Sequence, residues 1–124
     1  MTGFIVFAHG SRVESANEAV RVASSRLAEA GGHVVEPAFL ELGIPDLRGA
    51  VDRLANQGLT RIVVIPYFLT LGTHMQRDLP KLVDAASVAH GGLDIRIAPP
   101  LDGHPALIDA LLDRARAATA GDPE

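Results

Sequence analysis

The chain has 124 residues and contains no cysteine, and its 11 Lys and Arg residues stand against 15 Asp and Glu residues. This length is enough for one domain with a real hydrophobic core, and a hydrophobic content of 48% argues against disorder. The net charge of −4 provides no basic surface for nucleic acid or for an anionic membrane. The lack of cysteine excludes disulfides, thiolate metal sites and cysteine nucleophiles.

The N-terminal apolar segment, residues 1–8, is too short to span a membrane. It also lacks the charged region and the small-residue cleavage site of a secretory signal peptide. We therefore expect a cytoplasmic protein that has neither nucleic acid nor a membrane as a partner.

The first part of the chain predicts two strands with a helix between them. Residues 4–8 are continuously apolar, which is typical of a strand buried on both faces. Small and apolar residues recur at three- and four-residue spacing over residues 16–30, and two glycines, residues 31–32, predict the end of this helix. A second strand is expected over residues 34–40, where Pro37 favours an edge position in the sheet.

The middle of the chain predicts a helix, a strand, a loop and another helix. Apolar residues at helical spacing predict a helix over residues 47–54. Residues 61–66 have the clearest strand pattern of the chain, and residues 67–73 are expected to form a loop or an extension of that strand. The next helix is expected to begin near Asp78, which would place Pro80 in the first turn, where proline is tolerated.

The last part of the chain predicts a fourth strand over residues 95–98 and a final helix over residues 107–115. We expect one domain over residues 1–120, followed by a frayed C-terminal tail over residues 121–124.

Four strands that alternate with four helices indicate an α/β fold, in which a parallel sheet has helices on both faces. Because Pro37 places the second strand at an edge and crossovers are right-handed, the expected strand order is 2-1-3-4. This arrangement is a flavodoxin-like three-layer sandwich. Ligands of such sheets bind at the carboxyl ends of the strands, beside the switch point between the first and third strands.

Two histidines are expected beside that switch point. His9 directly follows the first strand, and His74 lies in the segment after the third strand. Two imidazoles at one crevice can bind a divalent ion such as Fe²⁺, Co²⁺, Ni²⁺ or Zn²⁺, and they can also accept protons near neutral pH. The alternative is that each histidine caps a local turn, but their convergence on one crevice favours a functional pair.

Four further polar residues are expected near the same crevice, and all are candidates for binding a substrate. Glu41 ends the second strand on that side and could act as a base or a carboxylate ligand, or simply be solvated. Arg12, Arg77 and Lys81 could receive an anionic substrate, although each could equally be ordinary surface charge. Arg77 and Lys81 are four residues apart, so a helix would place them on one face.

The other three histidines are less suited to this chemistry. His104 precedes a proline at the start of the final helix, which favours a capping role. His33 and His90 lie before the second and fourth strands, at the opposite edge of the sheet. We expect both of these side chains to be exposed and unrelated to the site.

Several motifs of the sequence carry a family resemblance: V-F-A-H-G-S-R at residues 6–12, P-A-F-L-E-L at 37–42, I-V-V-I-P-Y-F-L at 62–69, G-T-H at 72–74 and R-D-L-P at 77–80. The Gly-x-His-x-x-x-Asp-x-Pro segment that contains the last two motifs is the most specific of them. Together they resemble the small single-domain sirohydrochlorin chelatases, within the class II tetrapyrrole chelatases. The order and spacing of the motifs cover nearly the whole chain.

The resemblance implies a chelatase-like fold and the insertion of Co²⁺, Fe²⁺ or Ni²⁺ into a sirohydrochlorin-type macrocycle, as in the biosynthesis of cobalamin or sirohaem. It identifies His9 and His74 as the active-site pair, which could serve as catalytic bases or as metal ligands. Arg12, Arg77 or Lys81 would help to hold the carboxylate-rich macrocycle. The metal is a substrate in this scheme, and no permanently bound cofactor is implied.

The resemblance also implies a homodimer, because longer relatives contain two such domains that face each other across a cleft. Two other functions remain open at this point. A non-catalytic carrier of a metal or a tetrapyrrole would use the same fold without turnover. A binder of flavin or nucleotide is less favoured, because the sequence lacks both the P-loop and the GxGxxG phosphate-binding motifs and has few aromatic residues.

Overall fold

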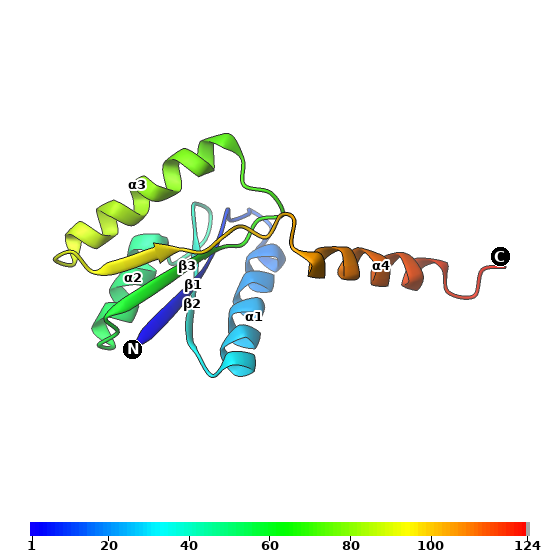
Figure 1. Ribbon diagram of the computed structural model, residues 1–124, viewed down its shortest axis with the longest axis horizontal. Helices are drawn as coiled ribbons and strands as arrows, with labels where there is room; N and C mark the ends of the chain where they lie inside the picture. Colours follow the sequence, from blue (N-terminus) through cyan, green and yellow to red (C-terminus); the bar gives the residue numbers. More distant parts are fainter. Residues whose placement is uncertain (124) are drawn as a thin grey trace.

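The computed structural model describes residues 1–123 and shows a regular alternation of strands and helices (Figure 1). In chain order the elements are β1 (Thr2–Ala8), α1 (Glu14–Gly31), β2 (Val34–Phe39), α2 (Leu47–Asn56), β3 (Arg61–Pro66), α3 (Thr73–Ala89), β4 (Asp94–Ile97) and α4 (Pro105–Thr119). This alternation is the α/β pattern predicted from the sequence.

The four strands form one parallel sheet in the order β2-β1-β3-β4, as predicted. The strand β1 is central, and its Phe7 lies between Ala38 of β2 and Pro66 of β3. Pro37 lies on the edge strand β2, where proline is tolerated because one side of the strand has no partner.

The other edge strand, β4, carries charged side chains. Asp94 accepts hydrogen bonds from Arg96 and Arg61, and these hold the pKa of its carboxyl below its ordinary value. Charges on an edge strand discourage pairing with the strands of other molecules.

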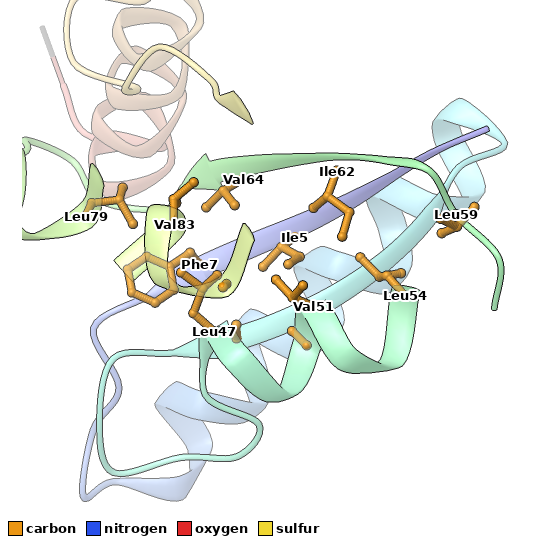
Figure 2. Close-up of a cluster of buried hydrophobic side chains, with 13 residues drawn as sticks. Ile5, Phe7, Leu47, Val51, Leu54, Leu59, Ile62, Val64, Leu79 and Val83 are labelled. Atoms are coloured by element: carbon orange, nitrogen blue, oxygen red, sulfur yellow. The ribbon is translucent and has the colours of Figure 1, made fainter. Parts of the chain in front are cut away.

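The larger hydrophobic core lies between the sheet and the helices α2 and α3 (Figure 2). Ile5 and Phe7 of β1 and Ile62 and Val64 of β3 point to this side and are fully buried. They pack against the apolar residues of the two helices, which are Leu47, Ala50, Val51, Leu54, Leu79, Val83 and Ala86.

The helix α1 covers the opposite side of β1 and β2. Val6 and Ala8 of β1 point to this side and pack with Val20 of α1 and Phe39 of β2. Helices therefore cover both faces of the sheet, which confirms the predicted layers. The strand β1 is buried on both faces, and this explains its unbroken apolar run.

The helix α3 begins at Thr73, well before the start near Asp78 that the sequence predicted. That prediction was wrong because Pro80 lies inside the helix rather than in its first turn. A proline there leaves the carbonyl of Gln76 without its intrahelical N–H partner. Both residues are exposed, so water can solvate that carbonyl and the helix continues. His74 therefore lies in the first turn of α3 and not in a loop.

The other element boundaries differ from the predictions by small shifts. The strand β1 begins at Thr2 rather than at residue 4, and β4 covers Asp94–Ile97 rather than residues 95–98. Residues 121–123 of the predicted tail follow α4, whereas Glu124 lies outside the described residues. The division of the chain into a domain over residues 1–120 and a tail stays a prediction.

The last helix, α4, has no buried residue and leaves the body of the molecule (Figure 1). It projects from the carboxyl edge of the sheet and covers neither of its faces. None of the helices within residues 1–123 combines the length and the apolar content that crossing a membrane requires.

Candidate functional site

The carboxyl edge of the sheet carries both histidines that the sequence selected. His9 directly follows β1, and His74 lies in the first turn of α3, the element that follows β3. A hydrogen bond of 2.7 Å from the Tyr67 N–H to the Phe7 carbonyl continues the pairing of β1 and β3 to this edge. Because the two strands are parallel neighbours, both histidines follow the same edge of the sheet, beside the switch point.

Glu41 is held next to His9 by the backbone. The pairing of β1 with β2 continues past Phe39, because the Leu40 N–H donates to the Ala8 carbonyl (2.9 Å) and the Glu41 N–H donates to the His9 carbonyl (3.1 Å). The Nδ1 atom of His9 lies 3.9 Å from Oε1 of Glu41, which is an ion-pair distance rather than a hydrogen-bond distance. The two side chains are 59% and 58% exposed, so an incoming ligand can reach both.

Gly10 allows this close approach of the two strand ends. Its φ of 93° lies in the left-handed region, and a Cβ atom at this position would clash with the carbonyl oxygen of Glu41. Any other residue would push Glu41 away from His9. A glycine directly after His9 is therefore a steric requirement of the site.

Asn17 joins the loops that follow β1 and β2. It lies on α1 and is 1% exposed. Its Oδ1 atom accepts a hydrogen bond from the Ser11 N–H, and its Nδ2 atom donates to the carbonyls of Ser11 and Leu42, each at 2.9 Å. Ser11 lies two residues after His9, and Leu42 directly follows Glu41. Asn17 therefore holds together the two segments that carry His9 and Glu41.

Asn17 is not among the residues predicted from the sequence, although the pattern of α1 contains a signal for it. The buried residues of this helix are Asn17, Val20 and Ser24, which recur at helical spacing. A polar side chain at a core-facing position must find its hydrogen-bond partners inside the protein. Which backbone groups it meets becomes visible only when the two loops are placed in space.

His74 contacts Arg77, which lies one helical turn further along α3. The Nη2 atom of Arg77 is 3.0 Å from Nδ1 of His74. A guanidinium group can only donate, so Nδ1 accepts this hydrogen bond and the proton of the neutral imidazole is on Nε2. Arg77 also lies 3.8 Å from the carboxylate of Asp78. In this structure the lone pair of His74 is therefore occupied by Arg77.

The two remaining candidate residues occupy exposed positions on neighbouring segments. Arg12 lies in the loop after β1, and Lys81 lies one turn beyond Arg77 on α3. Since α3 contains both Arg77 and Lys81, the prediction that they share a helix face is confirmed. The structure thus brings Glu41 and Arg77 directly to the two histidines, and it leaves Arg12 and Lys81 available to a ligand in solvent.

The structure shows His104 in a capping contact and His33 in an aromatic contact. His104 caps α4, as predicted, because its Nδ1 atom accepts a hydrogen bond of 3.0 Å from the Ala106 N–H. His33 lies at the opposite edge of the sheet and is exposed, as predicted. Its ring centroid lies 4.5 Å from that of Phe4.

The expectation that His90 is exposed is wrong. Its side chain is 24% exposed, and its Nε2 atom lies 2.6 Å from Oδ1 of Asp52 on α2. Arg48, one turn before Asp52, lies 3.7 Å from the same oxygen. The contact depends on the packing of α2 against α3, which brings together residues that are distant in the sequence. It lies at the edge opposite the candidate site, so its role is structural.

Replacing His90 with alanine should lower the free energy of unfolding by about 1 kcal/mol, because a half-buried hydrogen bond to a carboxylate is lost. Thermal unfolding followed by circular dichroism would measure this change. The exposed His33→Ala variant is the control and should stay within about 0.5 kcal/mol of the unsubstituted protein. Equal stability of the two variants would show that the contact with Asp52 contributes nothing.

The candidate site offers few ligands to a metal ion. Within residues 1–123, no group of three or more His, Asp and Glu side chains is placed to hold a metal. The chain supplies His9 with Glu41, and it supplies His74 on the same edge of the sheet. Imidazole and carboxylate groups bind Fe²⁺, Co²⁺ and Ni²⁺, and a small donor set leaves coordination positions open for a second ligand. This arrangement suits a metal ion that is bound and then passed on.

Several curated relatives of this chain are named sirohydrochlorin chelatases. The chloroplastic sirohydrochlorin ferrochelatase of Arabidopsis thaliana is 35% identical over 113 residues, which cover 90% of this chain and 50% of that protein. The sirohydrochlorin cobaltochelatase of Methanopyrus kandleri is 36% identical over 84 residues, which cover 67% of this chain and 59% of the relative. The sirohydrochlorin cobaltochelatase of Sulfurisphaera tokodaii is 29% identical over 114 residues, which cover 92% of this chain and 91% of the relative. The chain thus spans 50% and 59% of the first two relatives and nearly all of the third.

Two solved structures have the same fold. The CbiX protein from Marinobacter aquaeolei VT8 matches with a TM-score of 0.84 and 29% identity, over 95% of this chain and 97% of that chain. The sirohydrochlorin chelatase SirB from Bacillus subtilis subspecies spizizenii, in complex with cobalt, matches with a TM-score of 0.82 and 25% identity. That match covers 94% of this chain and 50% of SirB.

The sequence profile of the CbiX family matches residues 3–118, which contain the whole sheet apart from its first residue and the whole candidate site. The strand order and the named relatives agree with this match. The chain belongs to the CbiX family.

Proposed function

We propose that this chain is a sirohydrochlorin chelatase that inserts Co²⁺, Fe²⁺ or Ni²⁺ into the macrocycle, in the biosynthesis of cobalamin or sirohaem. The main support is the pair of exposed histidines, His9 and His74, at the switch-point edge of a CbiX-family sheet. Relatives named ferrochelatase and cobaltochelatase, and the structure of SirB with cobalt, support the same chemistry. The cytoplasmic location expected from the sequence stays a prediction.

Metal insertion exchanges the two inner N–H protons of the free macrocycle for one divalent ion. The ion must be bound loosely enough to leave the protein, and bases must accept the two protons as the metal–nitrogen bonds form. His9 and Glu41 suit this exchange, because an imidazole and a carboxylate 3.9 Å apart are both accessible to a ligand. One of them can bind the ion while the other accepts a proton.

Arg77 links substrate binding to the availability of the Nδ1 atom of His74, with which it forms a hydrogen bond. Sirohydrochlorin is rich in carboxylates, and a guanidinium group binds a carboxylate more strongly than it binds a neutral imidazole. A substrate carboxylate that engages Arg77 therefore releases the Nδ1 atom of His74, which now lies 3.0 Å from the guanidinium. The released imidazole can then bind the metal or accept a proton. Arg12 and Lys81 offer further cations to the other carboxylates of the substrate.

A homodimer is the proposed active form. The chain spans half of the chloroplastic ferrochelatase and half of SirB, so those proteins have room for a second domain of this size. One chain presents a single wall to a large flat macrocycle. Two copies with facing carboxyl edges would form a cleft with two walls and twice the number of histidines.

The direct test offers the purified protein sirohydrochlorin together with Co²⁺, Fe²⁺ or Ni²⁺ in turn and follows the absorbance change of the macrocycle. A chelatase should form many equivalents of metal complex per chain, faster than the reaction without protein. The alternative function, a carrier that uses the same crevice, would give at most one equivalent per chain. A rate equal to the background with all three ions would contradict the proposed activity.

A further inference from the structure

Leu42 is the one residue other than glycine within residues 1–123 whose backbone φ is positive. Its φ of 58° lies in the left-handed region, which a leucine side chain disfavours and which glycine or asparagine adopts more readily. Leu42 directly follows Glu41 in the loop that connects β2 to α2. Strained backbone positions of this kind cluster at functional sites, so the side chain of Leu42 needs an explanation beyond local folding.

The surrounding structure holds the backbone of Leu42 in this conformation. Its carbonyl accepts a hydrogen bond of 2.9 Å from Nδ2 of Asn17, whose side chain is buried. Gly43 follows directly, and a Cβ atom at that position would lie only 2.8 Å from the ring of Phe39. The loop is therefore packed tightly against the end of β2. These contacts fix the backbone at Leu42 and do not involve its side chain.

The side chain of Leu42 lies outside the hydrophobic core. It is 50% exposed and belongs to neither of the two clusters of buried residues in the described part of the chain. Ile44, two residues further along the same loop, is 78% exposed. Leucine at position 42 thus brings backbone strain without full burial in return. A contact with another molecule explains this residue better than packing inside the chain does.

Apolar side chains are also exposed on the other side of His9. Tyr67 and Leu69, in the segment after β3, are 43% and 74% exposed. Because β1 lies between β2 and β3, the backbone of His9 lies between the segment that carries Leu42 and the segment that carries Tyr67. The two outer strands are about 10 Å apart, which is comparable with the width of a ring of four pyrroles. The carboxyl edge of the sheet therefore presents apolar groups on both sides of an imidazole.

We propose that Leu42 is a substrate-binding residue whose side chain packs on the flat face of the macrocycle, beside His9 and Glu41. The inference rests on the proposed function and adds a residue that recognises the ring itself. The carboxylates at the rim of the substrate pair with cations, whereas the conjugated face of the ring is apolar and gains from burial against an aliphatic side chain. A metal ion or a small carboxylate has no such face, so Leu42 favours the ring over both.

Leu42→Asn is the direct test, because asparagine tolerates the left-handed backbone and removes the apolar contact. The variant should melt at or above the temperature of the unsubstituted protein. Its affinity for metal-free sirohydrochlorin, measured at equilibrium from the fluorescence of the ring, should fall by about fivefold or more. In the metal-insertion assay the KM for the macrocycle should rise by a similar factor while kcat is retained, since a contact made equally in the ground state and the transition state changes only KM.

Leu42→Met and Val88→Ala are the matched controls. Methionine keeps an aliphatic side chain of similar volume at the strained position, so Leu42→Met should keep the affinity for the macrocycle. Val88 lies near the end of α3, at the opposite edge of the sheet, and is 77% exposed. Val88→Ala removes exposed apolar surface far from the site and should leave the affinity unchanged.

An unchanged affinity of Leu42→Asn for the macrocycle would overturn the proposal. A clearly lower melting temperature would assign Leu42 to the fold, and a fall in kcat at unchanged affinity would show that the substitution acts by moving Glu41; either result would contradict the direct contact. The unsubstituted protein decides the proposed function separately. If it turns over and Leu42→Asn binds the ring equally well, only the role of Leu42 is refuted, whereas an unsubstituted protein that binds no sirohydrochlorin would contradict both.

Discussion

Replacing His74 with alanine should slow metal insertion by about a hundredfold or more, because the loss of one positioned acid–base group typically costs that much. The fold should remain intact, since His74 is exposed in the first turn of α3 and exposed substitutions usually change stability by less than about 0.5 kcal/mol. The rate is measured from the absorbance of the macrocycle, and the melting temperature is measured on the same sample.

His9→Ala should have an effect of similar size, because His9 is the exposed imidazole next to Glu41. The double variant should be less impaired than the product of the two single effects if both residues act on one metal ion in one step. His33→Ala, at the opposite edge of the sheet, is the matched control and should insert metal at the unsubstituted rate. If a folded His74→Ala protein inserts metal at the unsubstituted rate, the site assignment is wrong and the carrier function is favoured.

Replacing Asn17 with alanine should lower both the stability and the activity, although Asn17 is a positioning residue that need not touch the substrate. The substitution removes three hydrogen bonds to the backbone of Ser11 and Leu42 from a nearly fully buried position. Losing such partners costs about 1–3 kcal/mol in stability, which corresponds to a fall in the melting temperature of roughly 5 °C or more. The freed loops should let His9 and Glu41 drift apart, so the rate of insertion should fall at temperatures where the variant is still folded.

Ser24→Ala separates the positioning role of Asn17 from a simple loss of stability. Ser24 is also buried on α1, but its Oγ atom donates to the carbonyl of Val20 within the same helix and contacts neither loop. This control should lose stability while keeping the kcat and KM of the unsubstituted protein. Asn17→Asp retains the acceptor for the Ser11 N–H but cannot donate to the Leu42 carbonyl, so it should not recover the activity. Equal losses of activity in Asn17→Ala and Ser24→Ala would contradict the positioning role.

The sheet and the location of the site follow from local patterns in the sequence. An unbroken apolar run predicts the buried central strand, and Pro37 predicts the edge, because both features depend on how much of a strand is covered. Together with the handedness of crossovers, they lead to the strand order and therefore to the edge of the sheet that carries both His9 and His74. The His104 cap is also local, since the donor it satisfies lies two residues away.

The remaining features depend on contacts between distant parts of the chain. Asn17 meets Leu42 at a separation of 25 residues, and His90 meets Asp52 at 38 residues, so no local pattern names either partner. The early start of α3 depends on Pro80 lying on a solvated side of the helix, which is a property of the packed molecule. The spacing of apolar residues in α4 predicts a helix with one apolar stripe but not its position, because that position depends on which surfaces the other elements leave open.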